Sequence, residues 1–252
     1  MTTKIQTLPV AVVTGGSRGI GRQITKLLTQ KGYKVYFTFR SDKESAKTLT
    51  EELNTGEYSG EAIGCQCDMV DMNSVTELFN LIKKQAGRVD VLVNNAGVLG
   101  EMRPFLFAND GRWYETLDHN VKCVTNSCKR VLPLMIRQKK GRIVNVTSIA
   151  ARLGNPGQSA YAASKAAIVA FSKSLYREVS PMGITINCVS PGLVDTDMTN
   201  NLNEKYTAEI LNTPLARMAY ASEVANMVSY LATDAPEYLL GQELILDGGL
   251  GL

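Results

Sequence analysis

The sequence predicts a doubly wound α/β fold, in which one parallel sheet is covered by helices on both faces. Short, nearly continuous apolar runs alternate with amphipathic helical patterns along the 252 residues, and strands of that kind are buried on both faces. A glycine-rich turn stands between the first strand and the first helix, where such folds bind ligands. With 44% apolar and 20% charged residues, the chain can bury one large core.

The expected elements follow in regular order. The Val-rich run 9–13 ends at Thr14-Gly15-Gly16 and predicts a buried strand entering a turn. The helical pattern that begins at Ile20 ends at Gly32, a typical C-terminal stop. Further strands are expected at 34–39, 61–66, 89–93, 142–147, 185–189 and 243–246, and further helices at 43–53, 73–86, about 111–138 and 158–180.

One region, 195–218, is polar and helical in pattern and has no strand of its own. It predicts an excursion over the sheet, and beside a binding crevice such a segment is a small helical lid. Since no change of composition marks a linker, residues 1–252 are expected to form a single domain.

The composition excludes several classes of protein. The net charge of +3, without a basic block, gives no argument for binding nucleic acid or a membrane. No leader-like or membrane-spanning stretch is present, so we expect a soluble, cytoplasmic protein. The five cysteines are an odd, unpatterned set and should be free thiols. His119 is the single histidine, which excludes His-based triads and multi-His sites, and no metal is expected.

The glycine-rich turn predicts a dinucleotide site. Its glycines let the chain turn sharply and approach a pyrophosphate, which then lies on the free N–H groups of the following helix. A plain strand-to-helix turn is the alternative. The residues expected to contact the cofactor here are Gly15, Gly16, Ser17, Arg18, Gly19, Ile20 and Gly21.

The end of the second strand indicates which dinucleotide binds. An acid usually stands there to bind the ribose 2′-hydroxyl, but this chain has Arg40, whose guanidinium suits a 2′-phosphate, with Arg18 close by. NADP(H) is therefore favoured, although a solvated charge is the alternative for Arg40 and Asp42 leaves NAD open. Asp68 and the segment 94–97 end the next two strands at the same crevice.

A phenol and an ammonium, Tyr161 and Lys165, lie four residues apart and share one helical face. A Lys charge about 5 Å from a phenol should lower the phenol's pKa by roughly two units, which suits a general acid or base. Alone, this spacing is more often a surface pair. Ser148 follows a strand and faces the same crevice, whereas Asn120 by itself suggests a structural role.

These motifs together resemble the short-chain dehydrogenase/reductases over essentially the whole chain, which implies a Rossmann fold. The resemblance rests on Thr14-Gly15-x-x-x-Gly19-x-Gly21, Asn95-Ala96-Gly97, Asn120, Ser148, Tyr161-x-x-x-Lys165 and Pro191-Gly192. Within that family, segments 183–187, 190–198 and 241–249 look like the 3-oxoacyl-[acyl-carrier-protein] reductases.

The resemblance implies a role for each matching residue. Tyr161 would donate a proton, Ser148 would hold the substrate carbonyl oxygen, Lys165 would bind the nicotinamide ribose, and Asn120 would hold a water that connects Lys165 to solvent. Pro191, Gly192, Val194 and Thr196 would border the nicotinamide, Asp68 and Met69 the adenine, and Asn95, Ala96 and Gly97 would line the cofactor cleft.

The resemblance also implies partners. An acyl carrier protein would dock on basic residues, for which Arg137, Lys139, Lys140 and Arg177 are candidates, and a solvated basic face is the alternative. The bulky segment 101–113 would shape an acyl pocket or pack under the lid. Family members are commonly tetramers that pack through the helices at 111–138 and 158–180. A catalytic His119 is disfavoured, because a lone histidine is more often structural.

Three functions are carried forward. The leading one is NADPH-dependent reduction of a 3-oxoacyl thioester on a carrier protein, in fatty-acid or related assembly. The second is an NADP(H)-dependent reductase of another ketone, a sugar or a CoA thioester, since fold alone does not define the substrate. The third is an NADP(H)-binding protein without turnover, which would have no need of a proton donor beside the cofactor.

Overall fold

The computed structural model describes residues 8–199 and 213–251. Seven parallel strands form its central sheet, in the order β3-β2-β1-β4-β5-β6-β9. The strands are β1 (Val10–Val13), β2 (Lys34–Phe39), β3 (Glu61–Gln66), β4 (Val91–Asn94), β5 (Gly141–Val146), β6 (Ile184–Pro191) and β9 (Glu243–Leu246). The order reverses between β1 and β4, and ligands bind at such a reversal beyond the carboxyl ends of the strands. The predicted fold class is confirmed.

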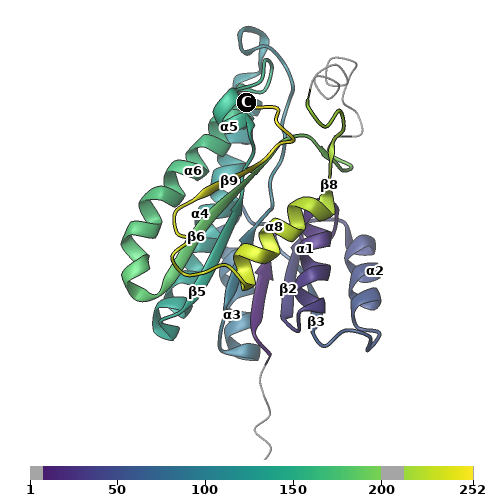
Figure 1. The fold of residues 1–252 in the computed structure, drawn as a ribbon, viewed down its shortest axis with the longest axis vertical. Coiled ribbons are helices and arrows are strands. Elements are labelled where there is room, and N and C mark those ends of the chain that lie inside the picture. The colour runs from purple at the N-terminus through teal and green to yellow at the C-terminus, as the bar shows by residue number, and fades with distance from the viewer. Residues whose placement is uncertain (1–7, 200–212, 252) are drawn as a thin grey trace, which may run out of the picture.

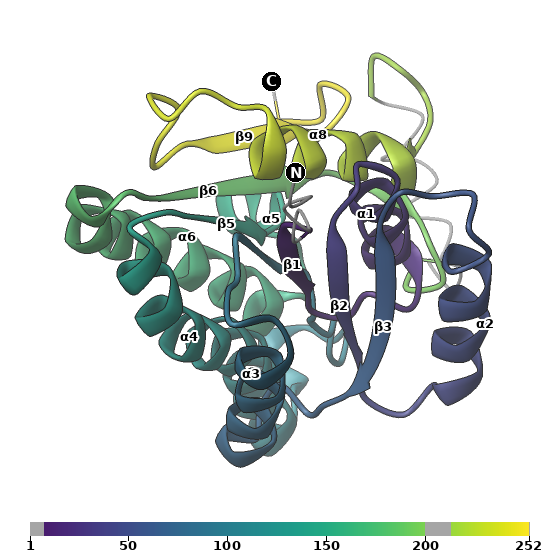
Figure 2. The ribbon, with the colours of Figure 1, turned by 90° about the horizontal axis from the view of Figure 1, so that it is seen from below.

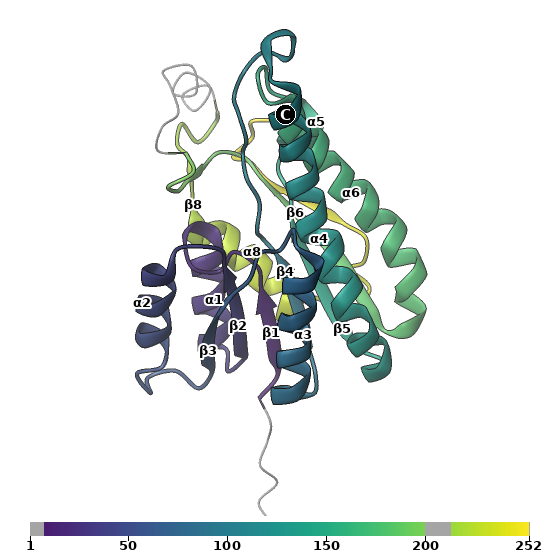
Figure 3. The same cartoon turned by 180° about the vertical axis from the view of Figure 1, so that it is seen from behind.

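Helices cover both faces of this sheet (Figures 1 and 2). One layer contains α1 (Gly19–Gln30), α2 (Lys43–Leu53) and α8 (Ala221–Thr233); the other contains α3 (Met72–Ala86), α4 (Asp110–Gln138) and α6 (Ser159–Val179). In the second layer α4 lies between α3 and α6 (Figure 3). Side chains of β1 alternate between the layers, because Val10 and Val12 join one apolar cluster while Ala11 and Val13 join the other.

Local sequence explains where several helices begin and end. Asp42, Asp71 and Asn109 each accept hydrogen bonds from first-turn N–H groups of α2, α3 and α4. Helix α3 ends at Gly87, whose φ of +70° is the left-handed conformation that glycine adopts without strain. The sequence pattern did not predict helix α8, because the N-cap of this helix is Tyr220 rather than a short polar residue. The Glu223 carboxylate caps it instead, by accepting from the Tyr220 N–H at 2.8 Å.

The region 195–218 departs in part from the sequence prediction. Two short strands bracket it, β7 (Val194–Asp195) and β8 (Ala219–Tyr220), and they pair in parallel beside the main sheet. The predicted helical lid falls mainly on 200–212, outside the described residues. Two short elements also go beyond the prediction, α5 (Ala150–Leu153) after β5 and a 3-10 turn η1 (Phe105–Phe107) before α4. Among the described helices, none is long and apolar enough to cross a membrane.

Candidate active site

The glycine-rich turn leaves β1 at the reversal of strand order. Gly15 has a φ of +63°, a conformation that L side chains rarely adopt, and a Cβ on Gly21 would collide with the Gly15 carbonyl oxygen. The Asn95 side chain donates to the carbonyls of Thr14 and Gly15 at 3.1 and 3.0 Å, and the Thr14 hydroxyl accepts from the Asn95 and Ala96 N–H groups. The ends of β1 and β4 are therefore held together around the turn.

The start of α1 fits the pyrophosphate of a dinucleotide. Its N-cap, Arg18, makes no side-chain capping hydrogen bond, and no acid stands in the first turn. The first N–H groups of α1 and the positive end of its dipole are thus available to an anion. Thr196 lies over this turn, because a Cβ on Gly19 would be 3.5 Å from the Thr196 Cγ2. The structure thereby brings the segment that follows β7 to the predicted phosphate site.

The outer end of the crevice carries the charged side chains on which the predicted choice of cofactor depends. Arg18 and Arg40 are both exposed. The carboxylate of Asp42 is occupied by the start of α2, where it accepts from the Ser45 N–H at 3.0 Å. Hydrogen bonds from Ser45, aided by the charge of Arg18, lower the pKa of Asp42. Burial, followed by the charge of Arg40, lowers the pKa of the half-buried His119.

A side chain of α4 holds the main chain that follows β3 at the end of the crevice. The Asn126 side chain on α4 donates to the carbonyls of Met69 and Val70 at 3.1 and 3.0 Å. Asp68 is exposed and accepts from the Val70 N–H at 3.0 Å. The predicted adenine-binding residues Asp68 and Met69 therefore stand at the carboxyl end of β3, on the same edge as the glycine-rich turn.

Tyr161 and Lys165 lie together on α6. The Lys165 Nζ is 5.6 Å from the centre of the Tyr161 ring and donates to the Val146 carbonyl oxygen at 3.0 Å. Ser148 follows β5, which also contains Val146, and its hydroxyl hydrogen-bonds to the Tyr161 phenol. One serine, one phenol and one ammonium thus meet where β5 ends beside α6.

The pKa direction expected for Tyr161 is wrong. Burial raises the pKa of Tyr161, and the hydrogen bond with Ser148 only partly opposes this rise. Burial also lowers the pKa of Lys165 to about 8. The expectation weighed the Lys165 charge but left out the transfer of the phenol itself from water, which disfavours phenolate.

Asn120 completes the set from α4 and is fully buried. Its amide donates to the Val98 carbonyl and the Ser164 hydroxyl, both at 2.9 Å, and its Oδ1 accepts from the Val98 N–H at 2.8 Å. A Cβ on Gly97 would lie 3.0 Å from the Asn120 Oδ1 and 3.5 Å from the Lys165 Nζ, so these three residues converge. Sequence reasoning missed Ser164, although its place between Tyr161 and Lys165 in the motif was a usable signal.

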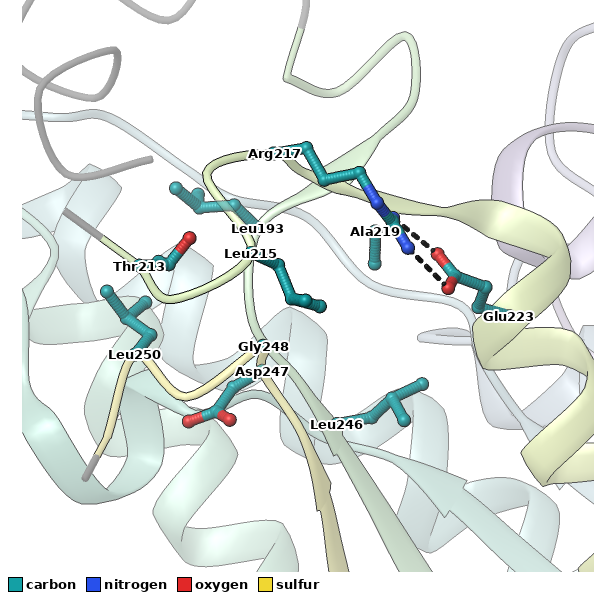
Figure 4. Close-up of a pocket in the computed structure, with 10 residues that line it drawn as sticks. All are labelled: Leu193, Thr213, Leu215, Arg217, Ala219, Glu223, Leu246, Asp247, Gly248 and Leu250. Atoms are coloured by element: carbon teal, nitrogen blue, oxygen red, sulfur yellow. Dashed lines mark hydrogen bonds and ion pairs between the residues drawn. The ribbon is translucent and has the colours of Figure 1, made fainter. Parts of the chain in front are cut away.

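The Pro191–Gly192 turn is backed by the C-terminal segment. A Cβ on Gly192 would lie 2.9 Å from the Asp247 Cα, and Asp247 accepts from the Gly249 N–H at 3.0 Å. Beside this turn lies a hollow that is open to solvent, which Arg217 and Glu223 border with an ion pair of 2.8 Å (Figure 4). Its lining residues are Leu193, Thr213, Leu215, Arg217, Ala219, Glu223, Leu246, Asp247, Gly248 and Leu250. None of the four expected catalytic residues lines it, so this hollow flanks the chemistry.

The basic residues expected at the entrance lie elsewhere in a single chain. Arg137 is in the last turn of α4, and Lys139 and Lys140 come just before β5, whereas Ser148 follows the other end of that strand. Arg177 ends α6, twelve residues and about 18 Å from Lys165. Helices of this fold run antiparallel to the strands, so their C-terminal ends lie away from the crevice. Two other cations, Arg103 and Arg112, line a small hollow with Ser159 and Ala160 at the start of α6, close in sequence to Tyr161, and we call them the entrance cations.

A parallel sheet with a phosphate-binding turn at its reversal, and a Ser, Tyr and Lys beside it, defines a dinucleotide-dependent oxidoreductase. The family model for short chain dehydrogenases matches residues 9–207. The chain belongs to this family, and membership implies a nicotinamide cofactor.

Known relatives and solved structures agree with this assignment. The chain is 38% identical over 241 residues to a 3-oxoacyl-[acyl-carrier-protein] reductase of Staphylococcus epidermidis, covering 95% of this chain and 98% of the relative. It is also 38% identical over 242 residues to the Escherichia coli reductase of the same name, with 96% of each chain covered. The crystal structure of gox2181 superposes with a TM-score of 0.90 at 32% identity, covering 96% of this chain and 95% of the other.

Proposed function

We propose that this chain reduces 3-oxoacyl thioesters, carried on an acyl carrier protein, to 3-hydroxyacyl products with NADPH, in fatty-acid or related assembly. The observation that carries the chemistry is the meeting of Ser148, Tyr161 and Lys165 beside the dinucleotide crevice. The substrate class is supported by the names of relatives that cover nearly the whole chain.

In the proposed reaction Ser148, Tyr161 and Lys165 each have a separate role. The nicotinamide supplies a hydride to the carbonyl carbon when it is bound. Ser148 donates a hydrogen bond to the carbonyl oxygen, and the protonated Tyr161 gives that oxygen its proton. Lys165 uses one of its three ammonium hydrogens on Val146, so the others are free to bind the ribose hydroxyls.

The buried amide of Asn120 fixes the main chain at Val98, and in the proposed mechanism Asn120 would hold a water that connects Lys165 to solvent. This water would let Lys165 restore the proton that Tyr161 gives up. In this proposal the pyrophosphate would lie on the turn 15–21, the adenine beside Asp68 and Met69, and the nicotinamide beside the 191–196 segment. The position of these segments at one edge of the sheet supports the assignment.

NADPH is favoured over NADH by charge. Arg18 and Arg40 are exposed at the ribose end, and the nearest acid, Asp42, is committed to capping α2. Guanidinium groups bind phosphate through charge-assisted hydrogen bonds.

We further infer a cytoplasmic homotetramer. All five cysteines are buried free thiols, as is usual in a reducing compartment. If two copies pack through α4 about a two-fold axis perpendicular to that helix, their two α4 helices run antiparallel. That packing would bring Lys139 and Lys140 of one copy toward the crevice of the other, about 43 Å along the helix.

The deciding assay follows NADPH oxidation at about 340 nm with an acetoacetyl thioester, either on the carrier protein or on a truncated pantetheine. Reduction of both, with a lower KM for the carrier-bound form, would support the proposal. No reduction of either would overturn it in favour of a reductase of another ketone, a sugar or a CoA thioester. Cofactor binding without turnover of any carbonyl compound would favour the non-catalytic alternative.

A further inference from the structure

A buried carboxylate from the last strand reaches the segment that carries Ser148. Glu243 lies on β9, beside β6, and its side chain is only 5% exposed. Its Oε1 accepts from the Ser190 hydroxyl at 2.7 Å, and its Oε2 accepts from the Arg152 guanidinium at 3.0 and 3.1 Å. Each oxygen of one carboxylate therefore binds a different neighbour.

These two neighbours hold the chain on both sides of Ser148. The Ser190 hydroxyl is 2.6 Å from the hydroxyl of Thr147, the residue before Ser148. The Thr147 hydroxyl also lies 2.9 Å from the Val189 carbonyl oxygen, so when the single Ser190 proton goes to Glu243, the Thr147 proton is shared between Ser190 and Val189. On the other side Arg152 belongs to α5, which begins two residues after Ser148.

Main-chain hydrogen bonds also hold the segment around Ser148. The Thr147 N–H donates to the Val189 carbonyl at 2.8 Å, and the Ala150 N–H donates to the Ser148 Oγ at 3.2 Å. The Ile149 N–H donates to the Pro191 carbonyl at 2.9 Å, and the Ala151 N–H donates back to the Ser148 carbonyl at 3.0 Å. Helix α5 is a single turn, too short to be stable without tertiary contacts. The ion pair between Arg152 and Glu243 adds a side-chain contact between α5 and the sheet.

We propose that Glu243 and Arg152 are positioning residues that fix the Ser148 hydroxyl toward the substrate carbonyl and the Tyr161 phenol. This inference rests on the role proposed above for Ser148. The buried carboxylate of Glu243 can hold this segment from both sides, because it binds the Ser190 hydroxyl, which contacts Thr147 before Ser148, and anchors α5 after it. A buried charge without its partner is strongly disfavoured, so Glu243 also keeps Arg152 in place.

The proposal predicts a specific kinetic effect for Arg152→Gln. Loosening the segment should lower kcat about tenfold, since small displacements of a catalytic group are costly, while cofactor affinity is unchanged. Arg152→Lys keeps the charge and should recover most of the activity. Lys47→Gln removes the cation of the exposed Lys47–Glu51 pair on α2 and is the matched control.

A double-mutant cycle separates positioning from general stability. If Arg152 acts through Ser148, adding Arg152→Gln to Ser148→Ala should cause no further loss of kcat. Additive losses would mean that the ion pair acts elsewhere and would overturn the proposal.

Hydrogen–deuterium exchange tests the same contact without a substrate. Arg152→Gln should speed amide exchange in a peptide covering 147–153 several-fold and leave peptides of α3 unchanged. Unchanged exchange in 147–153 would overturn the proposal. A wild-type chain that fails to reduce the thioester would refute the proposed function alone, because the exchange result still decides whether the ion pair holds the segment.

Discussion

The ammonium of Lys165 donates to the main-chain carbonyl oxygen of Val146 at 3.0 Å, and the whole lysine is only 5% exposed. Burial lowers its pKa to about 8, with small opposing contributions from Cys123 and Cys188. A group that must carry charge for function is therefore kept where charge is unfavourable. The free-energy cost of burying this charge lowers the stability of the folded protein, as is common for lysines with perturbed pKa values in binding sites.

Replacing Lys165 should stabilise the unliganded protein near neutral pH. Below about pH 8 the lysine is charged in both folded and unfolded chains, so the full cost of burying the charge is present. That cost is of order 3 kcal/mol, and the lost hydrogen bond to Val146 offsets about half of it. We expect Lys165→Met to abolish reduction and raise Tm by roughly 3 °C at pH 7.

The increase in Tm should shrink as pH rises from about 8 toward 10.5, the pKa of the lysine in the unfolded chain. Over this range Lys165 loses its proton in the folded protein first, so the free-energy cost of burying its charge disappears. Thermal unfolding of both proteins at several pH values checks this. A difference in Tm that does not depend on pH would contradict the assigned pKa.

Tyr161 should act as the proton donor over a wide pH range. Burial raises the pKa of its phenol, so the protonated form persists through neutral pH and declines only as pH rises toward that raised value. We expect reduction to be flat between about pH 6 and 7 and to fall as Lys165 loses its proton near pH 8, whereas alcohol oxidation, which needs phenolate, should begin to rise with pH. Steady-state rates in both directions measure this.

Tyr161→Phe should lower kcat at least 10²-fold, on the order of a general acid's contribution, with NADPH affinity retained. Cofactor titration of the same variant is the control. Unchanged turnover in Tyr161→Phe would remove the phenol from the mechanism.

The fold could be predicted from the sequence because the patterns that define strands and turns are local. The features that were not predicted depend on burial and on contacts between residues far apart in the sequence. Apolar runs and glycine positions predicted every strand of the main sheet. Helix α8 was missed because its cap is made by Glu223 reaching back to Tyr220. The pKa of Tyr161 depends on burial that only packing creates, and the ion pair of Arg152 with Glu243 joins residues 91 positions apart.

Arg40 should determine the choice of cofactor. Arg40→Glu replaces a guanidinium with a carboxylate that repels a 2′-phosphate and can accept from ribose hydroxyls. We expect kcat/KM for NADPH to fall roughly 10²-fold and that for NADH to stay level or rise. Lys47→Glu, a charge reversal one turn into α2, is the matched control. Equal loss with both cofactors would assign Arg40 a structural role.

The basic residues at the end of α4 provide a test of carrier docking that depends on assembly. Within one chain Lys139 and Lys140 lie at the edge of the sheet opposite Ser148, so they can meet a carrier protein at a crevice only if a second copy presents them. We expect Lys139→Gln with Lys140→Gln to raise KM for the carrier-bound thioester about three- to tenfold, since each exposed charge contributes up to about 1 kcal/mol.

The pantetheine substrate should be unaffected, because it lacks the acidic partner, and the effect should weaken with added salt. Sedimentation of the variant establishes that the assembly is intact. An equal rise in KM for both substrates would place these lysines outside docking, and a monomeric wild-type protein that still prefers the carrier-bound form would assign docking to the entrance cations Arg103 and Arg112 instead.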